Sequence, residues 1–249
     1  MRYLETVMGV PMSIDIRDSG DHNDAAEQAF CQLRDADAIF STYRPDSVIS
    51  RLNRSELTLT TVGDRFTDVL NLAERFSTVS GGVFVLRTAD GQCDLNGIVK
   101  GWAAEQAATV LRAHGLRNFC LNAGGDVIAA GHPKPTRCWQ VGVRSPQSAA
   151  SMLAVFALTD VSIATSGAYE RGQHIIDGRT NRVATGLSSV SVISPDLTTA
   201  DVLATTVYAM GQDGVSWAAE RYDCAILAVA ENGKLIDGGD LRRWLARPA

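Results

Sequence analysis

A carboxylate and a hydroxyl four residues apart are the first candidates for chemistry. Asp201 and Thr205 lie in an otherwise apolar stretch, residues 200–206, that is typical of a helix, so their oxygens would share one face. A carboxylate among apolar residues is costly unless it is paired or bound to a cation. A carboxylate, a hydroxyl and a backbone carbonyl suit a hard cation such as Mg²⁺. The alternative is that Asp201 helps to cap the start of its helix.

Lys100 is a second candidate, because it falls in the first turn of a helix expected to begin near Asn96 and Gly97. A cation at that end opposes the helix dipole. An anion bound at the same terminus would remove the conflict, since free N–H groups and Lys100 could both meet a phosphate. The alternative is that Lys100 points into water. The segment lacks the spacing of a P-loop.

His174 is a third candidate, in the segment 174–177, where a strand would place His174 and Ile176 on one face. A histidine near a metal-bound phosphate could take a proton from an attacking hydroxyl, although a lone histidine is commonly a hydrogen-bonded structural residue. Glycine-rich turns at 122–126 and 165–167 each follow an expected strand. Such turns allow close backbone approach to a ligand, and they also make ordinary connections.

The elements that must position these residues follow from hydrophobic periodicity. Alternation at Met12, Ile14 and Ile16 predicts a strand pair broken near residues 9–11, and Asn23 is expected to cap a following helix that reaches Phe40. Further helices are expected at 64–78, 96–114 and 200–210, and another is expected to follow and end at about residue 222. Further strands are expected at 119–121, 139–143, 153–158, 161–165, 190–193, 225–230 and 235–236. Because many strands come in succession, we expect an α+β fold with largely antiparallel sheets flanked by helices. Without a repeat or a linker, residues 1–249 are expected to form a single domain.

Composition, charge and the spacing of the cysteines argue against several classes of protein. A formal charge of −5 and a pI near 5.4 argue against a nucleic-acid partner, and no apolar run approaches the ~20 residues of a membrane span. The N-terminal residues carry neither a signal-peptide core nor a lipidated cysteine, so a cytoplasmic location is expected. The five cysteines are widely spread, without a Cys-x-x-Cys pair, and are expected to be buried, inert thiols.

In their order along the chain, several short blocks resemble the ApbE-like family of FAD:protein FMN transferases, from about residue 6 to residue 212. The blocks are Met8-Gly9; residues 41–47 with Ser50 to Asn53; residues 94–101; Gly124-Gly125-Asp126; Thr165-Ser166-Gly167-x-Tyr169; residues 174–177; and Ala200-Asp201-x-x-Ala204-Thr205. Val10 replaces the threonine of the family's opening Met-Gly-Thr. The resemblance implies an ApbE-like fold.

The resemblance also implies an activity: Mg²⁺-dependent transfer of FMN from FAD to a threonine hydroxyl of an acceptor protein, with release of AMP. By the same resemblance, residues that would contact FAD are Met8 and Tyr43 at the flavin end, Val83, Phe84 and Val85 along the pocket, and Asp94, Lys100 and Ile176. Mg²⁺ would be held by Asp201 and Thr205, with backbone oxygen from the Gly97 to Val99 turn and from Ala204. His174 would activate the acceptor threonine, with Asp201 as the second catalytic residue.

The chain departs from the family pattern in three places. The usual Phe-Asp-Pro-Thr is replaced at 84–88, several dozen residues that normally precede Asp94 are missing, and the usual Asp-Pro-x-Thr-Gly is Asp177-Gly178-Arg179-Thr180-Asn181. These departures motivate two alternatives. One is hydrolysis of FAD to FMN and AMP, with water in place of the threonine, and the other is a catalytically weak flavin-binding protein. The acceptor's identity and the oligomeric state do not follow from the sequence.

Overall fold

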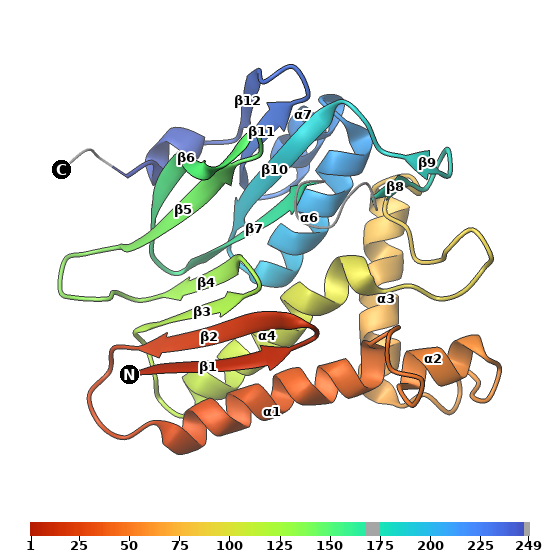
Figure 1. The fold of residues 1–249 in the computed structure, drawn as a ribbon, viewed down its shortest axis with the longest axis horizontal. Helices are drawn as coiled ribbons and strands as arrows, with labels where there is room; N and C mark the ends of the chain where they lie inside the picture. Colours follow the sequence, from red (N-terminus) through yellow and green to blue (C-terminus); the bar gives the residue numbers. More distant parts are fainter. Residues whose placement is uncertain (168–174, 247–249) are drawn as a thin grey trace.

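The computed structural model describes residues 1–167 and 175–246, and its central feature is an eight-stranded antiparallel sheet (Figure 1). The strand order is β1-β2-β3-β4-β7-β10-β11-β12. These strands are β1 (Arg2–Val7), β2 (Val10–Ile16), β3 (Phe119–Ala123), β4 (Asp126–Ala130), β7 (Val161–Gly167), β10 (Leu187–Ser194), β11 (Ala225–Ala230) and β12 (Leu235–Gly238). Two small sheets pair β5 (Trp139–Ser145) with β6 (Ser148–Leu158) and β8 (Ile176–Asp177) with β9 (Arg182–Val183).

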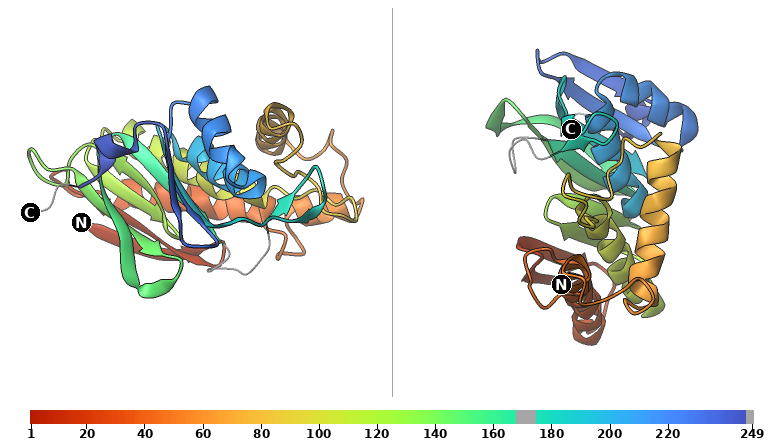
Figure 2. Two further views of the ribbon diagram at one scale, coloured as in Figure 1. Left: turned by 90° about the horizontal axis from the view of Figure 1, so that it is seen from above. Right: turned by 90° about the vertical axis from the view of Figure 1, so that its right-hand side faces the viewer.

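Helices cover one face of the large sheet, and the β5–β6 hairpin covers the other (Figure 2). The covering helices are α1 (Asn23–Phe40), α4 (Asn96–Ala113), α6 (Leu197–Met210) and α7 (Asp213–Arg221). Helix α2 (Val48–Asn53) packs on α1 and α3 (Asp64–Val79) on α4, while the 3-10 helix η1 (Leu241–Trp244) lies on the hairpin side. Strand side chains alternate between the two faces. Ile128 therefore joins the large cluster under the helices, whereas Val127 and Ala129 join a second cluster under the hairpin.

Helices α4 and α6 lie against each other, and small residues allow their close approach. A Cβ at Gly101 of α4 would lie 2.7 Å from the Leu197 carbonyl oxygen and 2.8 Å from Cβ of Asp201, both on α6. Most of α6 is buried, as expected of a helix that is apolar on nearly all sides. The two helices that carry Lys100 and Asp201 are thus held at a fixed, short separation.

The start of α6 shows that Asp201 is not a helix cap. The N-cap is Asp196, whose side chain accepts a hydrogen bond from Thr199 N at 2.8 Å. Glu105 of α4 accepts from Leu197 N at 2.7 Å, so a second carboxylate satisfies the same terminus. The capping interpretation of Asp201 is therefore wrong.

The expected elements are confirmed apart from their ends and a few omissions. The capping role given to Asn23 is wrong, because His22 is the N-cap and Asn23 Oδ1 accepts from the Tyr3 hydroxyl at 3.1 Å. Strand β4, helix α2 and strand β9 were not expected, whereas β8 falls within the segment 174–177 that was considered as a strand. Every residue of β4 is buried, so its sequence carries no alternation to mark it as a strand.

The cysteines only partly match the expectation of buried thiols. Cys93 is buried, Cys31 is exposed, and the other three are half-buried. Burial raises the pKa of the Cys120 thiol to about 12 and that of Cys224 to about 11, which disfavours the reactive thiolate at both. In the described ranges no helix combines the length and apolar character that crossing a membrane requires.

Candidate functional site

Asp201 is a buried carboxylate at the contact between α4 and α6. Its Oδ2 accepts a hydrogen bond from Gly101 N at 2.9 Å, and its Oδ1 lies 3.7 Å from Lys100 Nζ. Burial raises the pKa of Asp201 to about 6; the positive charge of Lys100 offsets part of this rise, and the negative charge of Asp126 adds to it. Asp201 is therefore a carboxylate whose charge is incompletely compensated.

Lys100 ion-pairs with both carboxylates, and its side chain is 24% exposed. Its Nζ contacts Asp126 Oδ2 directly and lies farther from Asp201. The alternative in which Lys100 simply points into water is wrong, because the side chain turns toward two buried acids. An ammonium with this access to both carboxylates and solvent can still meet an anionic ligand from outside.

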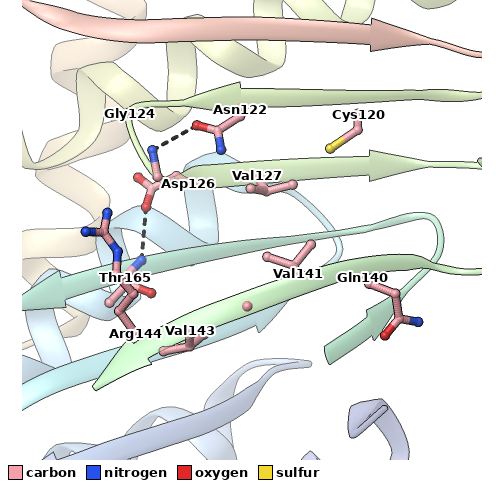
Figure 3. Close-up of a pocket in the computed structure, with 12 residues that line it drawn as sticks. Cys120, Asn122, Gly124, Asp126, Val127, Gln140, Val141, Val143, Arg144 and Thr165 are labelled. Carbon is pink, nitrogen blue, oxygen red and sulfur yellow. Dashed lines mark hydrogen bonds between the residues drawn. The ribbon is translucent and has the colours of Figure 1, made fainter. Parts of the chain in front are cut away.

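Asp126 is a site residue to which sequence reasoning gave no role. It follows the Gly124-Gly125 turn, is 2% exposed, and accepts a hydrogen bond from Thr165 N at 3.0 Å through Oδ1. The turn itself is held by a bond from Gly125 N to Asn122 Oδ1 at 2.9 Å, and Figure 3 shows both bonds. The available signal was an acidic residue directly after a strand and a glycine pair, which is too common a pattern to single it out.

A hydroxyl of α6 meets a hydroxyl of strand β7 close to this group. Thr205, one turn after Asp201, places its Oγ1 3.2 Å from Ser166 Oγ of β7. A Cβ at Gly97 would lie 3.7 Å from Thr205 Cγ2, so the start of α4 meets α6 at this level. Val99 and Ala204 are buried nearby on the same two helices. The structure thus places Gly97 and Lys100 of α4 beside Thr205 and Asp201 of α6, and the part of all six residues in binding a metal stays a prediction.

This donor set fits a hard divalent cation. Among the described residues, Asp126, Asp201 and Lys100 form a buried group with a net charge of −1, and the Thr205 and Ser166 hydroxyls lie on the neighbouring elements. Across the described residues, no three His, Cys, Asp or Glu side chains form a metal-binding group, so an all-protein cage for a softer metal is absent from that part of the chain. One or two carboxylates with water and phosphate oxygens are what Mg²⁺ uses.

Two segments that the sequence analysis expected to contact the cofactor, residues 83–85 and the strand that holds Ile176, lie next to each other. Val83 and Phe84 are buried, Val85 is half-buried, and the Val83 carbonyl accepts from Gly178 N at 3.1 Å. The side chains of Val83 and Phe84 therefore belong to the core, and their contact with a cofactor remains a prediction. Ile176 is half-buried in β8, which directly precedes the Gly178 that makes this hydrogen bond.

Asp94 is placed at the entry to α4. Its Oδ1 accepts from Asn96 N at 2.9 Å, and its own N–H donates to the Leu86 carbonyl at 2.9 Å. The carboxylate thus helps to satisfy the first turn of the helix that carries Lys100. A contact between Asp94 and FAD is untested by this geometry.

Met8 lies at the β1–β2 turn with a φ of 54°, beside Gly9. That turn neighbours the Gly124 turn, because a Cβ at Gly124 would lie 2.8 Å from Val10 Cγ2. Tyr43 is 92% exposed in the connection between α1 and α2. The structure does not join Tyr43 to the buried group within the described ranges, and His174 lies outside the described residues.

A cavity of about 290 Å³ opens on the opposite face of the sheet, between the β3–β4 turn and β5 (Figure 3). Its lining is mostly polar and includes Asn122, Gln140, Arg144 and Thr165. Asp126 lies at the boundary between this cavity and the Lys100 group, because its carboxylate joins Thr165 on one side and Lys100 on the other.

The fold and the site define a class: an α+β protein in which a buried acid–lysine group at a helix–helix contact offers adjacent places for a cation and an anion. The family model described as the ApbE family matches residues 8–90 and 85–228. The chain therefore belongs to the ApbE family.

Similar proteins agree with this membership. The chain is 36% identical to a FAD:protein FMN transferase of Treponema pallidum over 51% of its length, and 34% identical to one of Rhodobacter capsulatus over 62%. The matched stretches span 40% and 31% of those relatives, so the chain covers less than half of their length. The flavin transferase ApbE of Vibrio cholerae has a similar fold, with a TM-score of 0.83, 22% identity, and 98% and 99% of the two chains covered. The ApbE protein of Thermotoga maritima gives 0.85 at 21% identity, with 99% of each chain covered. The expected ApbE-like α+β fold is confirmed.

Proposed function

We propose that this protein is a Mg²⁺-dependent FAD:protein FMN transferase. The observation that carries the proposal is the Asp126–Lys100–Asp201 group, in which a buried, uncompensated carboxylate and an ammonium lie within 4 Å of each other. A metal-bound diphosphate needs a cation site and an anion site at this spacing. The printed names of its curated relatives support the same activity.

Mg²⁺ would be held by Asp201 and Thr205, with backbone oxygens of Gly97, Val99 and Ala204. In a regular helix the N–H of residue 101 serves the carbonyl of residue 97. Gly101 N donates to Asp201 Oδ2, and we propose that the Gly97 carbonyl oxygen serves as a ligand at this end of α4. When bound, Mg²⁺ would neutralise the charge that develops on the diphosphate.

FAD would lie with its diphosphate against Lys100. Met8 and Tyr43 are proposed at the flavin end, and Val83, Phe84, Val85, Asp94 and Ile176 along the rest of the cofactor. The exposed Tyr43 offers an aromatic face that is free to stack on a flat ring. Buried Val83 and Phe84 would act mainly by shaping the wall behind Val85.

The proposed reaction is a displacement at the phosphorus of the FMN half. The acceptor threonine oxygen forms a bond to this phosphorus, its proton passes to His174, and the phosphoanhydride bond breaks so that AMP leaves with the bridging oxygen. Lys100, held beside the breaking bond by its two acidic neighbours, stabilises the charge on the departing phosphate.

The test is a labelling reaction. The purified chain is incubated with FAD, MgCl₂ and an acceptor protein that carries the family's threonine motif, and covalent flavin fluorescence is read after denaturing electrophoresis. We expect label on the acceptor with wild type and none with Asp201→Ala. Asp18→Asn is the matched control, because Asp18 accepts backbone hydrogen bonds at the far ends of β2 and β3. Absence of label with intact FAD would contradict the proposal.

FAD hydrolysis is a second candidate, and a short loop favours it. Where the family has several dozen more residues, residues 87–93 form a tight turn closed by an Arg87–Cys93 bridge and a bond from Thr88 N to the Gln92 carbonyl at 2.9 Å. This turn leads into Asp94 and α4. Because it is short, the wall of the proposed FAD pocket would be lower here and could admit water to the diphosphate. Steady AMP release without acceptor would identify hydrolysis, whereas FAD binding with neither label nor AMP would identify a flavin-binding protein.

A further inference from the structure

We propose that Asp126 is a positioning residue for Lys100: its carboxylate anchors the ammonium and keeps it from closing on Asp201. The inference deepens the proposed function, on which its effect on FAD binding rests. Asp126 would not touch FAD or the metal; it would act through the lysine that does.

The Asp126 carboxylate is fixed from the side of the sheet. Strands β4 and β7 pair from Val127 opposite Ile163 onward, and Asp126 lies just beyond the end of this ladder. Its Oδ1 accepts from Thr165 N at 3.0 Å, so a side chain continues the link between the two strands. The other oxygen, Oδ2, is left facing Lys100 Nζ.

The backbone that carries Asp126 is equally constrained. Gly124 and Gly125 have φ values of 62° and 107°, which favour glycine, and Gly124 N donates to the Pro11 carbonyl at 3.1 Å. Val10 packs so closely on Gly124 that a Cβ there would lie 2.8 Å from Val10 Cγ2. A lysine, in contrast, has a flexible four-carbon stem, so its ammonium goes where its partners hold it.

Among the described residues, Asp126 and Asp201 are the acids that pair with Lys100, and the position of the ammonium between these two matters. At 3.7 Å, the Nζ to Asp201 Oδ1 separation is longer than an ordinary hydrogen bond, whereas the contact with Asp126 is direct. Without the charge of Asp126, the ammonium would move onto Asp201. It would then cover the proposed cation ligand and withdraw from the diphosphate.

The first test does not use FAD. Asp126→Asn keeps an oxygen for Thr165 N and removes the charge. In a nucleotide-free crystal structure of this variant, we expect Nζ of Lys100 within about 3.2 Å of Asp201 Oδ1, an ordinary hydrogen-bond distance. In Lys100→Met, Asp126 should keep its bond to Thr165 N, because the anchor does not depend on the lysine. Nζ remaining in place in the first variant, or Asp126 turning away in the second, would overturn the inference.

The second test asks whether Asp126 acts through Lys100. FAD affinity is measured by flavin fluorescence with MgCl₂ for Asp126→Asn, Lys100→Met and the double variant, with Asp18→Asn as control. We expect Asp126→Asn to bind FAD about tenfold more weakly, the size of one misplaced charged hydrogen bond. The double variant should bind no more weakly than Lys100→Met alone. Additive losses, or wild-type affinity in Asp126→Asn, would refute the positioning role.

The two tests separate this inference from the proposed function. If wild type did not bind FAD in the presence of MgCl₂, the transferase proposal would fail. The nucleotide-free structures would still decide whether Asp126 sets the position of Lys100.

Discussion

At the scale of single residues, the site is defined by an imbalance of charge. Two buried carboxylates, Asp126 and Asp201, share the ammonium of Lys100. Isolated buried charges are strongly disfavoured, and within the described part of the chain the group of these three residues has one negative charge in excess. The protein therefore holds Asp201 in an unfavourable state that a divalent cation would relieve.

Asp201→Asn should show this cost directly. Because the folded-state pKa of about 6 lies above the ordinary 3.8, the folded state holds its proton more tightly, and the stability of wild type falls relative to the variant as pH rises from about 4 to about 6. Above that range the variant should be at least as stable as wild type in EDTA, because the remaining Lys100–Asp126 pair is neutral. Urea unfolding of both proteins at about pH 4.5 and about pH 7.5 measures this difference in the free energy of unfolding. A variant equally destabilised at both pH values would contradict this, and MgCl₂ should stabilise only wild type.

Part of this site could be predicted from the sequence. The four-residue spacing of Asp201 and Thr205 indicated a shared helix face, and the position of Lys100 indicated an anion site. The position of Asp126 opposite Lys100 could not be predicted, because it depends on a long-range meeting of β4 with α4. The capping alternative for Asp201 failed because Asp196 and Glu105 had already satisfied that helix end.

At the scale of elements, the distance between α4 and α6 controls the site. Gly101 donates its N–H to the Asp201 carboxylate, and a Cβ at this position would collide with the Leu197 carbonyl and with Asp201 Cβ. The backbone of one helix thus touches a functional side chain of the other. A side chain at this position would separate Lys100 from Asp201 without removing either.

Gly101→Ala tests this spacing. Glycine to alanine in a helix ordinarily stabilises by about 1 kcal/mol. Here we expect a loss of about 1–3 kcal/mol, the range for overpacking, because the new methyl would meet a backbone carbonyl that cannot turn aside. Guanidinium unfolding measures the loss. Gly97→Ala is the comparison, since its methyl would meet the end of the Phe84 side chain rather than backbone, so its loss should be smaller.

The elements that sequence reasoning missed share a physical cause. Alternation of apolar and polar residues identifies a strand with one solvent-exposed face, as in β2. Strand β4 is covered on both faces, so its sequence carries no such alternation. Helix α2 is a six-residue element whose start is capped by Ser47, within a polar stretch that resembles a loop. Long amphipathic helices such as α1 and α3 were predictable because one apolar face meets the core.

At the scale of the whole molecule, one sheet serves two cores. Ile163 and Ile193 belong to the cluster under the β5–β6 hairpin, while Ala164 and Val192, their neighbours on the same strands, belong to the cluster under the helices. Neither cluster can be lost without exposing strands that support the other. We therefore expect the protein to unfold as one cooperative unit, in line with the single domain predicted from the sequence.

Equilibrium unfolding tests the single unit. Trp102 and Trp217 pack on the helical cluster, whereas Trp139 and Trp244 pack on the hairpin cluster. Two single-tryptophan variants are needed, one that keeps a tryptophan of the helical cluster and one that keeps a tryptophan of the hairpin cluster. Their fluorescence should give urea transitions with the same midpoint, coincident with far-UV circular dichroism. An earlier transition at Trp139 would indicate that the β5–β6 hairpin unfolds independently.

The deep burial of α6 has a consequence for how this protein can change. Its backbone amides should be among the slowest to exchange with deuterium, because exposing them would require nearly global opening. Substitutions that act on the proposed ligands of α6 would therefore be costly to the whole fold. If the proposed transfer reaction holds, we expect a change of acceptor to require changes in the outer connections, such as the turn at 87–93 and the exposed stretch around Tyr43.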